Sequence, residues 1–302
     1  MDFIALAKDI VGNDNVFINE KLNKHTTFRV GGPADCLVTP DSAEQVVVLV
    51  RECRRNNIPY FIIGNGSNLL VSDEGFKGII IKIGKNMSNL SIKDNIITAE
   101  AGALLAVIGA YAASMELAGF EFAAGIPGTL GGGCVMNAGA YGGELKDVLI
   151  SVKAINPEGD IRDFSIEELE MGYRTSIFLN KDYVVLQADI RLNKGEKTAI
   201  EARMRELAGM RREKQPLEFP NAGSTFKRPA GLFAGKLIED SGLKGKGVGG
   251  ACVSEKHAGF IINKGNATAQ DVYDTVQYVI STVSENTGVV LEPEIRIIGN
   301  FA

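Results

Sequence analysis

The chain has 302 residues, 45% apolar and 23% charged, which is typical of a globular protein large enough to fold without disulfides or metals. Its net charge of −5 argues against a nucleic-acid partner, which needs a dense basic surface. No run approaches the ~18 apolar residues of a membrane span, and four unclustered cysteines with two histidines predict no metal site and a reduced, cytoplasmic location.

The first third of the chain predicts strands around a helix. The N-terminus lacks the basic start and cleavage site of an export signal and predicts a short helix of the mature protein. Asp41 and Ser42 can both cap a helix, with Glu44 and Gln45 three residues on in the capping-box pattern. An apolar stripe then runs from Val46 to Cys53. We expect strands at 34–38, 60–63 and 78–83.

The middle of the chain predicts strands at 96–99, 149–155 and 183–192. A helix is expected over 104–117, with Gly119 as the residue that ends it. Ser165 and Glu168 predict a second capping box over a short helix.

The last third begins with a polar helix over 198–214, and we place the main domain boundary near residue 197. Further elements are then expected: helices at 233–241 and 270–286 and strands at 259–262 and 289–298. The fold class is α+β, without internal repeats.

Two segments are rich in glycine. Gly64-Asn65-Gly66-Ser67-Asn68 follows an apolar strand, and such a loop can point several amides at a pyrophosphate. A tight turn without a ligand would use the same residues. The loop is not a Rossmann fingerprint, because Leu69 stands at the third glycine, and no G-K-[ST] ending of a Walker A loop occurs.

The second segment, Gly125 to Gly143, has eight glycines in nineteen residues. Such a stretch loses much chain entropy on folding and gains little side-chain burial in return. A run of strained turns is one explanation. A main chain laid closely along a large flat ligand is the one we favour.

Six segments occur in a fixed order: FRVGGPAD (28–35), GNGSNLLV (64–71), AGIPGTLGGGCVMNAGAYG (124–142), GYRTS (172–176), NAGSTFKRP (221–229) and LEPEIR (291–296). With these motifs the chain closely resembles the UDP-N-acetylenolpyruvoylglucosamine reductases, also called UDP-N-acetylmuramate dehydrogenases or the MurB family. The resemblance covers nearly the whole chain. The short connection between Arg174 and Arg191 resembles the compact subtype, which lacks a tyrosine-bearing loop over the substrate.

The resemblance implies a two-lobed FAD-binding region of the vanillyl-alcohol-oxidase (PCMH) type and a C-terminal α+β substrate domain. We assign residues 1–84 to lobe 1, 85–197 to lobe 2 and 198–302 to the substrate domain. FAD would be held without a covalent bond. The partners implied are NADPH and UDP-N-acetylglucosamine enolpyruvate, with no nucleic acid and no membrane, and we expect a monomer.

The family reaction has two halves and serves peptidoglycan synthesis, and with it cell-wall biogenesis, cell shape and cell division. NADPH reduces the flavin, and flavin N5 then gives hydride to the vinyl carbon of the enolpyruvyl sugar. Charge develops on C2 and the carboxylate, so donors and a proton source are needed.

Three residues match the catalytic positions of the family. Arg174 of GYRTS would fork onto the substrate carboxylate, Ser224 of NAGS would protonate C2, and Glu294 of LEPEIR would stabilise the enolate. Glu294 would require a raised pKa for that role, through burial or the nearby Glu292, which Arg296 would oppose. We predict that Arg174, Ser224 and Glu294 converge on the face of the isoalloxazine ring.

The resemblance also assigns binding residues. The cofactor set comprises Gly64, Asn65, Gly66, Ser67, Asn68, Leu69, Gly125, Ile126, Pro127, Gly128, Gly131, Gly132, Asn137, Ala138 and Gly139. The substrate set comprises Tyr173, Lys214 and Gln215. The basic loop Gly242 to Gly247 is either a phosphate contact or, in our preferred interpretation, a solvated loop.

Other interpretations of single residues are more ordinary. Outside the family pattern, Arg174 would be a surface arginine, Ser224 a turn residue and Glu294 part of a solvated charged face. Ser224 and Lys227 spell S-x-x-K, but the S-D-N and K-T-G motifs of penicillin-binding enzymes do not occur. Two alternative functions remain: an oxidase or dehydrogenase of the same fold with another substrate, and a non-catalytic flavin or nucleotide-sugar binder.

Overall fold

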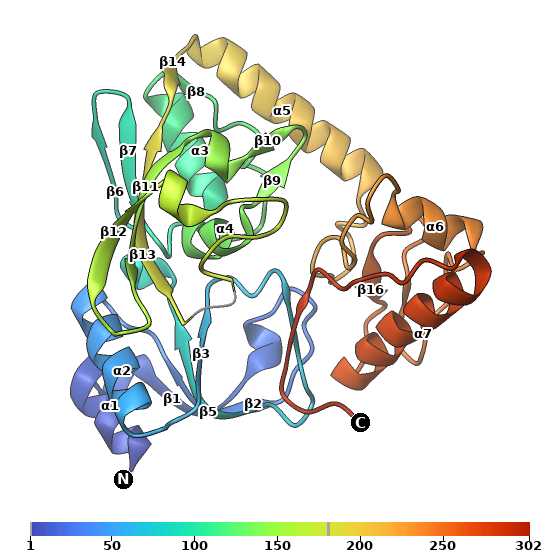
Figure 1. Cartoon of the computed structure of the whole chain (residues 1–302), viewed down its shortest axis with the longest axis horizontal. Coiled ribbons are helices and arrows are strands. Elements are labelled where there is room, and N and C mark those ends of the chain that lie inside the picture. The colour runs from blue at the N-terminus through green and yellow to red at the C-terminus, as the bar shows by residue number, and fades with distance from the viewer. Residues whose placement is uncertain (1, 180–181) are drawn as a thin grey trace. The chain divides into compact units, whose positions relative to one another are not determined.

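The computed structural model describes residues 2–179 and 182–302, which combine helices and strands (Figure 1). The chain divides into two compact units. Unit 1 comprises residues 1–18, 36–65 and 78–211, and unit 2 comprises residues 19–35, 66–77 and 212–302. Each unit has its own hydrophobic core, so each is described by itself.

The first part of unit 1 contains two helices beside a sheet. Helix α1 (Phe3–Val11) packs on α2 (Ala43–Arg55). The Ser42 hydroxyl accepts a hydrogen bond from the Gln45 amide at 3.3 Å, so the predicted start of α2 is confirmed. The sheet has the order β1-β2-β5-β3, with β1 Val16–Lys21, β2 Pro33–Val38, β3 Tyr60–Ile63 and β5 Phe76–Lys82. Residues 19–21, 33–35 and 76–77 of these strands are assigned to unit 2.

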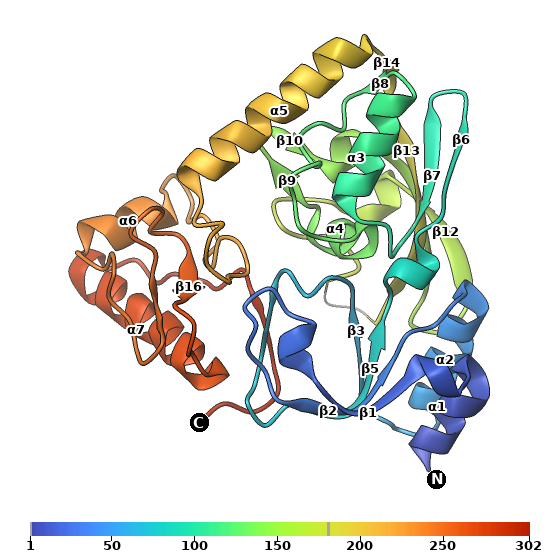
Figure 2. The same cartoon turned by 180° about the vertical axis from the view of Figure 1, so that it is seen from behind.

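The second part of unit 1 is an antiparallel sheet of five strands in the order β12-β11-β13-β7-β6. Figures 1 and 2 show α3 (Leu105–Ser114) and α4 (Leu130–Met136) together beside this sheet, and α4 packs on β13 and β7. The strands are β6 Leu90–Lys93, β7 Ile96–Glu100, β11 Leu149–Ile155, β12 Ile161–Ser165 and β13 Val184–Arg191.

Unit 2 is built around the long helix α7 (Ala269–Thr287), which packs on β15 (Ala251–Val253), β16 (Ile261–Asn263) and α6 (Ala234–Asp240). The side chain of Asp73 accepts hydrogen bonds from the Ala269 and Gln270 amides, both at 2.9 Å. A distant carboxylate therefore caps the N-terminus of this helix. β17 (Arg296–Ile298) pairs in parallel with β4 (Leu69–Val71).

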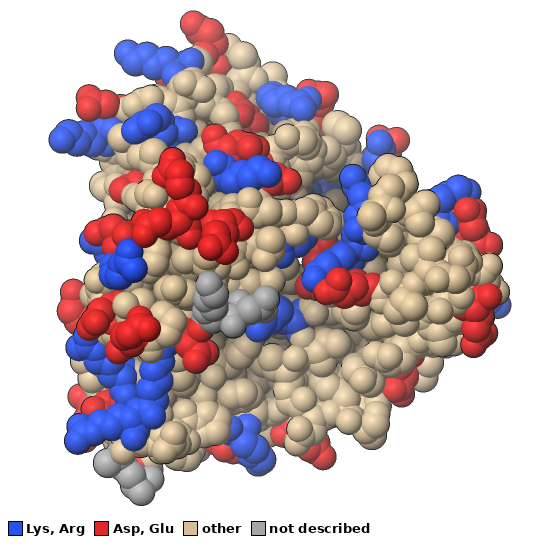
Figure 3. Space-filling view, in the orientation of Figure 1, with Lys and Arg blue, Asp and Glu red and all other residues tan. Residues whose placement is uncertain are grey.

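The remaining elements are short, apart from the polar helix α5. They are β8 Leu117–Ala118, β9 Gly139–Ala140, β10 Gly143–Glu144, β14 Asn193–Lys194, α5 Lys197–Lys214 and the 3₁₀ turns Asn13–Asn15, Leu22–Lys24, Lys85–Met87, Leu145–Asp147 and Glu167–Leu169. On the exposed side of α5, Arg203 pairs with Glu206 at 2.7 Å. Charges of both signs also lie among one another on the face drawn in Figure 3.

The predicted helices and most of the predicted strands are confirmed, with four corrections. Helix α3 ends at Ser114, not at residue 117, because Glu116 adopts the left-handed φ of 57° expected of Gly119. The final strand is limited to β17, preceded by an isolated bridge between Phe226 and Pro293. Ser165 does not cap a helix: Glu168 accepts from its amide, and a single 3₁₀ turn follows.

The fourth correction concerns elements that the sequence did not predict. The missed strands are β1, β4, β6, β8, β9, β10, β12, β14 and β15, and α4 lies inside the long glycine-rich segment, where we predicted no helix. α4 buries Leu130 and Cys134 on one face and ends at Asn137, whose φ is 42°. The helix forms through this packing, since its three glycines have low helix propensity.

The assignment of ligand-binding regions to 1–84, 85–197 and 198–302 stays a prediction. The two compact units are defined by contacts within the chain, whereas the three predicted regions are defined by the ligands that they would bind. In the structure α5 belongs to unit 1 as far as Arg211, and residues 19–35 and 66–77 belong to unit 2.

Candidate functional site

The two glycine-rich segments touch each other within unit 1. A Cβ atom on Gly64 would lie 2.1 Å from Thr129 Oγ1, just before α4. The Asn65 side chain donates a hydrogen bond to the Pro127 carbonyl at 2.6 Å. Only glycine permits this approach at position 64, so the backbones of both predicted cofactor loops form one surface.

The second half of the short loop belongs to unit 2. Gly66 has a φ of 62°, and a Cβ there would lie 1.9 Å from the His25 carbonyl oxygen. The Asn68 side chain donates to the Glu294 carbonyl at 3.1 Å, and the Arg296 amide donates to the Asn68 carbonyl at 2.8 Å. Through these bonds the short loop holds the segment that carries Glu294.

Within α4, packing explains two glycines and leaves one unexplained. A Cβ on Gly131 would lie 3.0 Å from Ala101 Cβ, and one on Gly133 would lie 2.8 Å from Leu145 Cδ1. A Cβ on Gly132 would meet nothing nearer than Thr129 Oγ1 at 3.8 Å. Because glycine in a helix costs ~1 kcal/mol relative to alanine, Gly132 fits a helix that a ligand approaches closely. The residues present therefore fit FAD.

Arg211 holds the start of the long segment, a contact that sequence reasoning missed. Its guanidinium donates to the Gly125 carbonyl and lies over the Tyr141 ring, with Cζ 5.9 Å from the ring centre. Burial lowers the pKa of Arg211, although hydrogen bonding and charge from Tyr141 act the other way. Nothing in the sequence distinguishes Arg211 from the other basic residues of α5, so no signal there would have found it.

Three other predicted cofactor residues, Gly128, Ala138 and Leu69, contribute to the structure through main-chain hydrogen bonds or by burial. The Gly128 carbonyl accepts from the Leu105 amide at 3.0 Å, and the Ala138 carbonyl accepts from the Leu145 amide at 3.0 Å. Leu69 is a buried residue of β4. That these residues contact FAD stays a prediction.

Arg174 lies in a strained turn of unit 1. Gly172 and Thr175 exchange both amide–carbonyl hydrogen bonds, at 3.1 and 3.3 Å, and Arg174 has a φ of 55°. Its Nη2 donates to the Gly139 carbonyl at 3.1 Å, and its Cζ lies 5.2 Å from the centre of the Tyr173 ring. A non-glycine residue in this conformation costs about 1–3 kcal/mol and is frequent at functional sites. The half-buried guanidinium thus lies at the end of the long glycine-rich segment.

Ser224 is exposed on a turn of unit 2 that lies between the buried residues Ala222 and Thr225. The Asn221 side chain accepts from the Gly223 amide at 2.9 Å, and Gly223 has a φ of 76°. Thr225, next to it, is fully buried and its amide donates to the Gly259 carbonyl at 2.8 Å. The backbone around Ser224 is fixed while its hydroxyl remains accessible.

Glu294 lies beside the Ser224 segment. Its amide donates to the Thr225 carbonyl at 2.8 Å, next to the bridge between Phe226 and Pro293. Glu292 forms an ion pair with Lys227, so its charge is partly compensated. A raised pKa of Glu294 stays a prediction.

The structure brings together the segments of Ser224 and Glu294, whereas Arg174 belongs to the other compact unit. Their convergence on one ring stays a prediction. Of the three predicted substrate residues, Tyr173 and Lys214 are exposed and Gln215 is half-buried. Their contacts with substrate also stay predictions.

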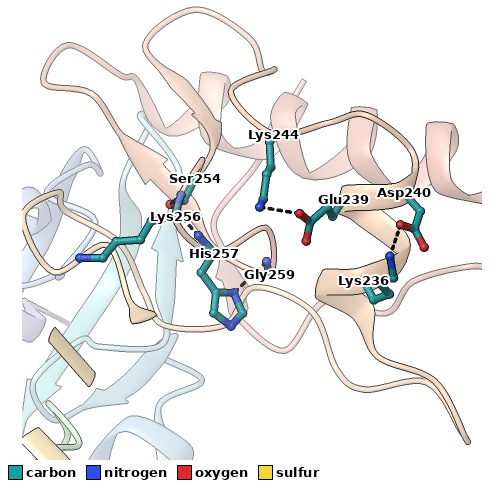
Figure 4. A network of polar contacts seen from close by, with 8 residues as sticks. All are labelled: Lys236, Glu239, Asp240, Lys244, Ser254, Lys256, His257 and Gly259. Atoms are coloured by element: carbon teal, nitrogen blue, oxygen red, sulfur yellow. Dashed lines mark hydrogen bonds and ion pairs between the residues drawn. The ribbon is translucent and has the colours of Figure 1, made fainter. Parts of the chain in front are cut away.

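The basic loop from Gly242 to Gly247 is partly neutralised. Figure 4 shows Lys244 donating to Glu239, at 2.7 Å, and the neighbouring pair of Lys236 and Asp240. The His257 Nδ1 accepts from the Gly259 amide at 3.1 Å, and burial lowers the pKa of this histidine. This arrangement favours the solvated-loop interpretation.

Two further expectations concern metals and thiols. Among the residues described, no cluster of His, Cys, Asp and Glu could hold a metal ion. Burial raises the pKa of Cys134 to about 12 and, together with the charges of Cys36 and Glu52, that of Cys53 to about 11, so neither is a thiolate at neutral pH. No helix within residues 2–179 and 182–302 combines the length and the apolar character of a membrane span.

Comparisons with known proteins identify the family. Residues 34–165 match the model of an FAD binding domain, and residues 215–298 match the C-terminal domain of UDP-N-acetylenolpyruvoylglucosamine reductase. A protein of that name from Clostridium perfringens (strain SM101 / Type A) is 51% identical over 99% of this chain and 98% of its own. One from Clostridium tetani is 52% identical over 99% of this chain and 97% of its own. The chain belongs to the UDP-N-acetylenolpyruvoylglucosamine reductase family.

Solved structures agree with this membership in the reductase family. The reductase from Thermus caldophilus superposes with a TM-score of 0.79 at 36% identity and covers 92% of this chain and 97% of its own. The glucose dehydrogenase Phl p 4.0202, at 15% identity and a TM-score of 0.51, shares the fold of the FAD-binding region. The predicted fold class, a PCMH-type FAD-binding region with a C-terminal α+β domain, is confirmed, and the protein is an FAD-dependent oxidoreductase.

Proposed function

We propose that this enzyme uses NADPH to reduce UDP-N-acetylglucosamine enolpyruvate to UDP-N-acetylmuramate, a step of peptidoglycan synthesis. The observation that carries the proposal is the 51% identity to a named reductase over 99% of the chain. The glycine-rich surface of unit 1 and the arginine at its end support it. A cytoplasmic, monomeric enzyme stays our prediction.

The glycine-rich main chain of unit 1 supports a proposal for the cofactor-binding residues. The main chain at Gly64, Gly132 and Gly139 would accommodate FAD. When bound, FAD would supply the redox chemistry that connects NADPH with the vinyl carbon of the substrate.

The chain's own residues would handle the carboxylate and the proton. Arg174 is permanently charged and can form two parallel hydrogen bonds to the substrate carboxylate, where charge grows as hydride arrives. Ser224 gives its hydroxyl proton to C2, and Glu294 stabilises the enolate. The saturated lactyl ether that results has gained one hydride and one proton.

The test is an anaerobic titration in two steps. NADPH should bleach the yellow enzyme, and the enolpyruvyl sugar should restore the colour at a rate that measures the second half-reaction. Failure of that sugar to restore the colour would refute the proposal. Rapid reoxidation by dioxygen together with that failure would indicate an oxidase of the same fold.

Ser224→Ala separates the two half-reactions. Bleaching by NADPH should stay near the wild-type rate, while recolouring should slow by about 10²–10⁴-fold, the usual contribution of a general acid. Ser281→Ala, an exposed serine on α7, is the matched control and should change neither rate. Equal losses in both halves would show that Ser224 is not the proton donor.

A further inference from the structure

Asn137 has an unusual position for a residue in a glycine-rich segment. Its side chain is fully buried, and its backbone is left-handed at the C-terminal end of α4. A buried amide of this kind must be hydrogen-bonded, since leaving it unpaired costs about 1–3 kcal/mol. The amide of Asn137 therefore forms its hydrogen bonds with the protein and not with solvent.

Three hydrogen bonds use this amide. Nδ2 donates to Glu144 Oε2 at 2.8 Å and to the Gly172 carbonyl at 2.9 Å, and Oδ1 accepts from the Lys146 amide at 3.0 Å. Two of these bonds connect the end of α4 to Glu144 and Lys146, just after the long segment. The third reaches Gly172, the first residue of the turn that carries Arg174.

The turn depends on such contacts because it is strained. Arg174 has a positive φ, which a free turn would relax. Within the described part of unit 1, side-chain hydrogen bonds link this turn to α4 and the following glycines: Asn137 to the Gly172 carbonyl, Arg174 to the Gly139 carbonyl, and Ser176 to the Val135 carbonyl at 2.8 Å. Of the side chains of Asn137 and Arg174, that of Asn137 is the fully buried one.

We propose that Asn137 is a positioning residue for Arg174, because its amide fastens the Gly172–Thr175 turn to the end of α4. The proposal rests on the proposed role of Arg174. Without the amide the turn relaxes and the guanidinium moves away from the place of the substrate carboxylate. A shift of about 1 Å in such a group costs about 10²-fold in rate.

The variant is Asn137→Gly, since glycine keeps the left-handed backbone and removes only the side chain. Recolouring by the enolpyruvyl sugar should slow by about 10²-fold, and bleaching by NADPH should change little. Asn156→Ala is the matched control: Asn156 is a buried asparagine of unit 1 whose Oδ1 accepts from the Asp160 amide at 2.7 Å, in a turn between β11 and β12. It should affect stability without separating the two half-reactions.

A readout independent of turnover is amide hydrogen exchange. The Thr175 amide donates within the strained turn, so its exchange should become faster in Asn137→Gly and remain unchanged in Asn156→Ala. Unchanged exchange at Thr175 would overturn the proposal. If Asn137→Gly does not fold, Ser176→Ala removes a neighbouring tether of the same turn, and the same measurements apply with the same expected and contrary outcomes.

The double variant with Arg174→Ala separates this proposal from the proposed function. If Asn137 acts through Arg174, Asn137→Gly has no further effect on recolouring once Arg174 is alanine. An equal loss in both backgrounds would refute the positioning role. Normal recolouring by Arg174→Ala alone would instead refute the role of Arg174, whatever Asn137→Gly does.

Discussion

The two glycine-rich segments have similar composition but differ in how completely protein contacts explain their glycines. In the short loop the protein itself requires them, since a Cβ on Gly64 would overlap Thr129 Oγ1 at 2.1 Å and one on Gly66 would overlap the His25 carbonyl at 1.9 Å. In the long segment protein contacts explain Gly133, Gly139 and Gly143 in the same way, whereas a Cβ on Gly132 would meet nothing nearer than Thr129 Oγ1 at 3.8 Å. A count of glycines therefore does not identify a ligand surface. A glycine that no protein contact explains indicates a ligand surface only in a segment that another observation connects to a ligand, such as the match of residues 34–165 to an FAD binding domain.

The largest effect should come from Gly64→Ala, which tests whether the short loop is built by protein contacts. Overpacking of this kind costs about 1–3 kcal/mol of unfolding free energy, measured in urea. Thr129→Ala in the same chain removes the overlapping hydroxyl and should restore much of the loss. A Gly64→Ala enzyme of unchanged stability would contradict the packing argument.

Gly132→Ala tests the other half of the comparison. Alanine should stabilise the FAD-free protein by up to ~1 kcal/mol through its helix propensity. The new methyl group should weaken FAD binding by about tenfold, or ~1.4 kcal/mol.

Gly209→Ala is the control for this change, because Gly209 lies inside α5 with nothing within 4 Å of a built Cβ. It should stabilise the protein in the same way and leave FAD affinity unchanged. FAD affinity is measured by flavin fluorescence, and stability by urea unfolding of the FAD-free form. If Gly132→Ala bound FAD as tightly as Gly209→Ala, the open space beside α4 would not belong to the cofactor.

How well the sequence predicted the fold depends on where the stabilising contacts lie. Helix α2 was predicted because a cap and an apolar stripe are local signals. Helix α4 was missed because its glycines oppose helix formation, and only contacts with distant residues such as Ala101 and Leu145 explain it. The short strand β4 likewise depends on β17, a partner far away in the chain.

The candidate site was predictable as a set of motifs and not as a set of contacts. The motifs pointed to Arg174, and the structure adds the strained turn around it and the carbonyl that it contacts. Arg211 carried no signal at all, because its partner is a main-chain carbonyl 86 residues earlier. Asn137 was predicted as a cofactor residue, yet its side chain is fully used by the protein, so that prediction now concerns only its main chain.

The smallest effect should be a pH dependence confined to the long segment. The short loop from Gly64 to Leu69 contains no titratable side chain, whereas the long one leads into Glu144. Burial by itself raises the pKa of Glu144, but hydrogen bonds from Lys146 and Asn137 and the positive charges of Lys146 and Arg174 outweigh it. The net pKa lies below its usual value of 4.5.

A carboxyl whose pKa is lower in the folded state binds protons more readily when unfolded, so it stabilises the fold above pH 4.5 and loses that contribution as the pH falls through its folded pKa. Glu144→Gln should therefore cost about 0.2–1 kcal/mol near neutral pH, as partly exposed ion pairs do, and nothing in strong acid. Glu158→Gln, at an exposed turn of the same unit, should cost nothing at either pH. A Glu144→Gln deficit that stayed constant on acidification would mean that the side chain acts by its shape and not by its charge, and the long segment would then be as insensitive to pH as the short one.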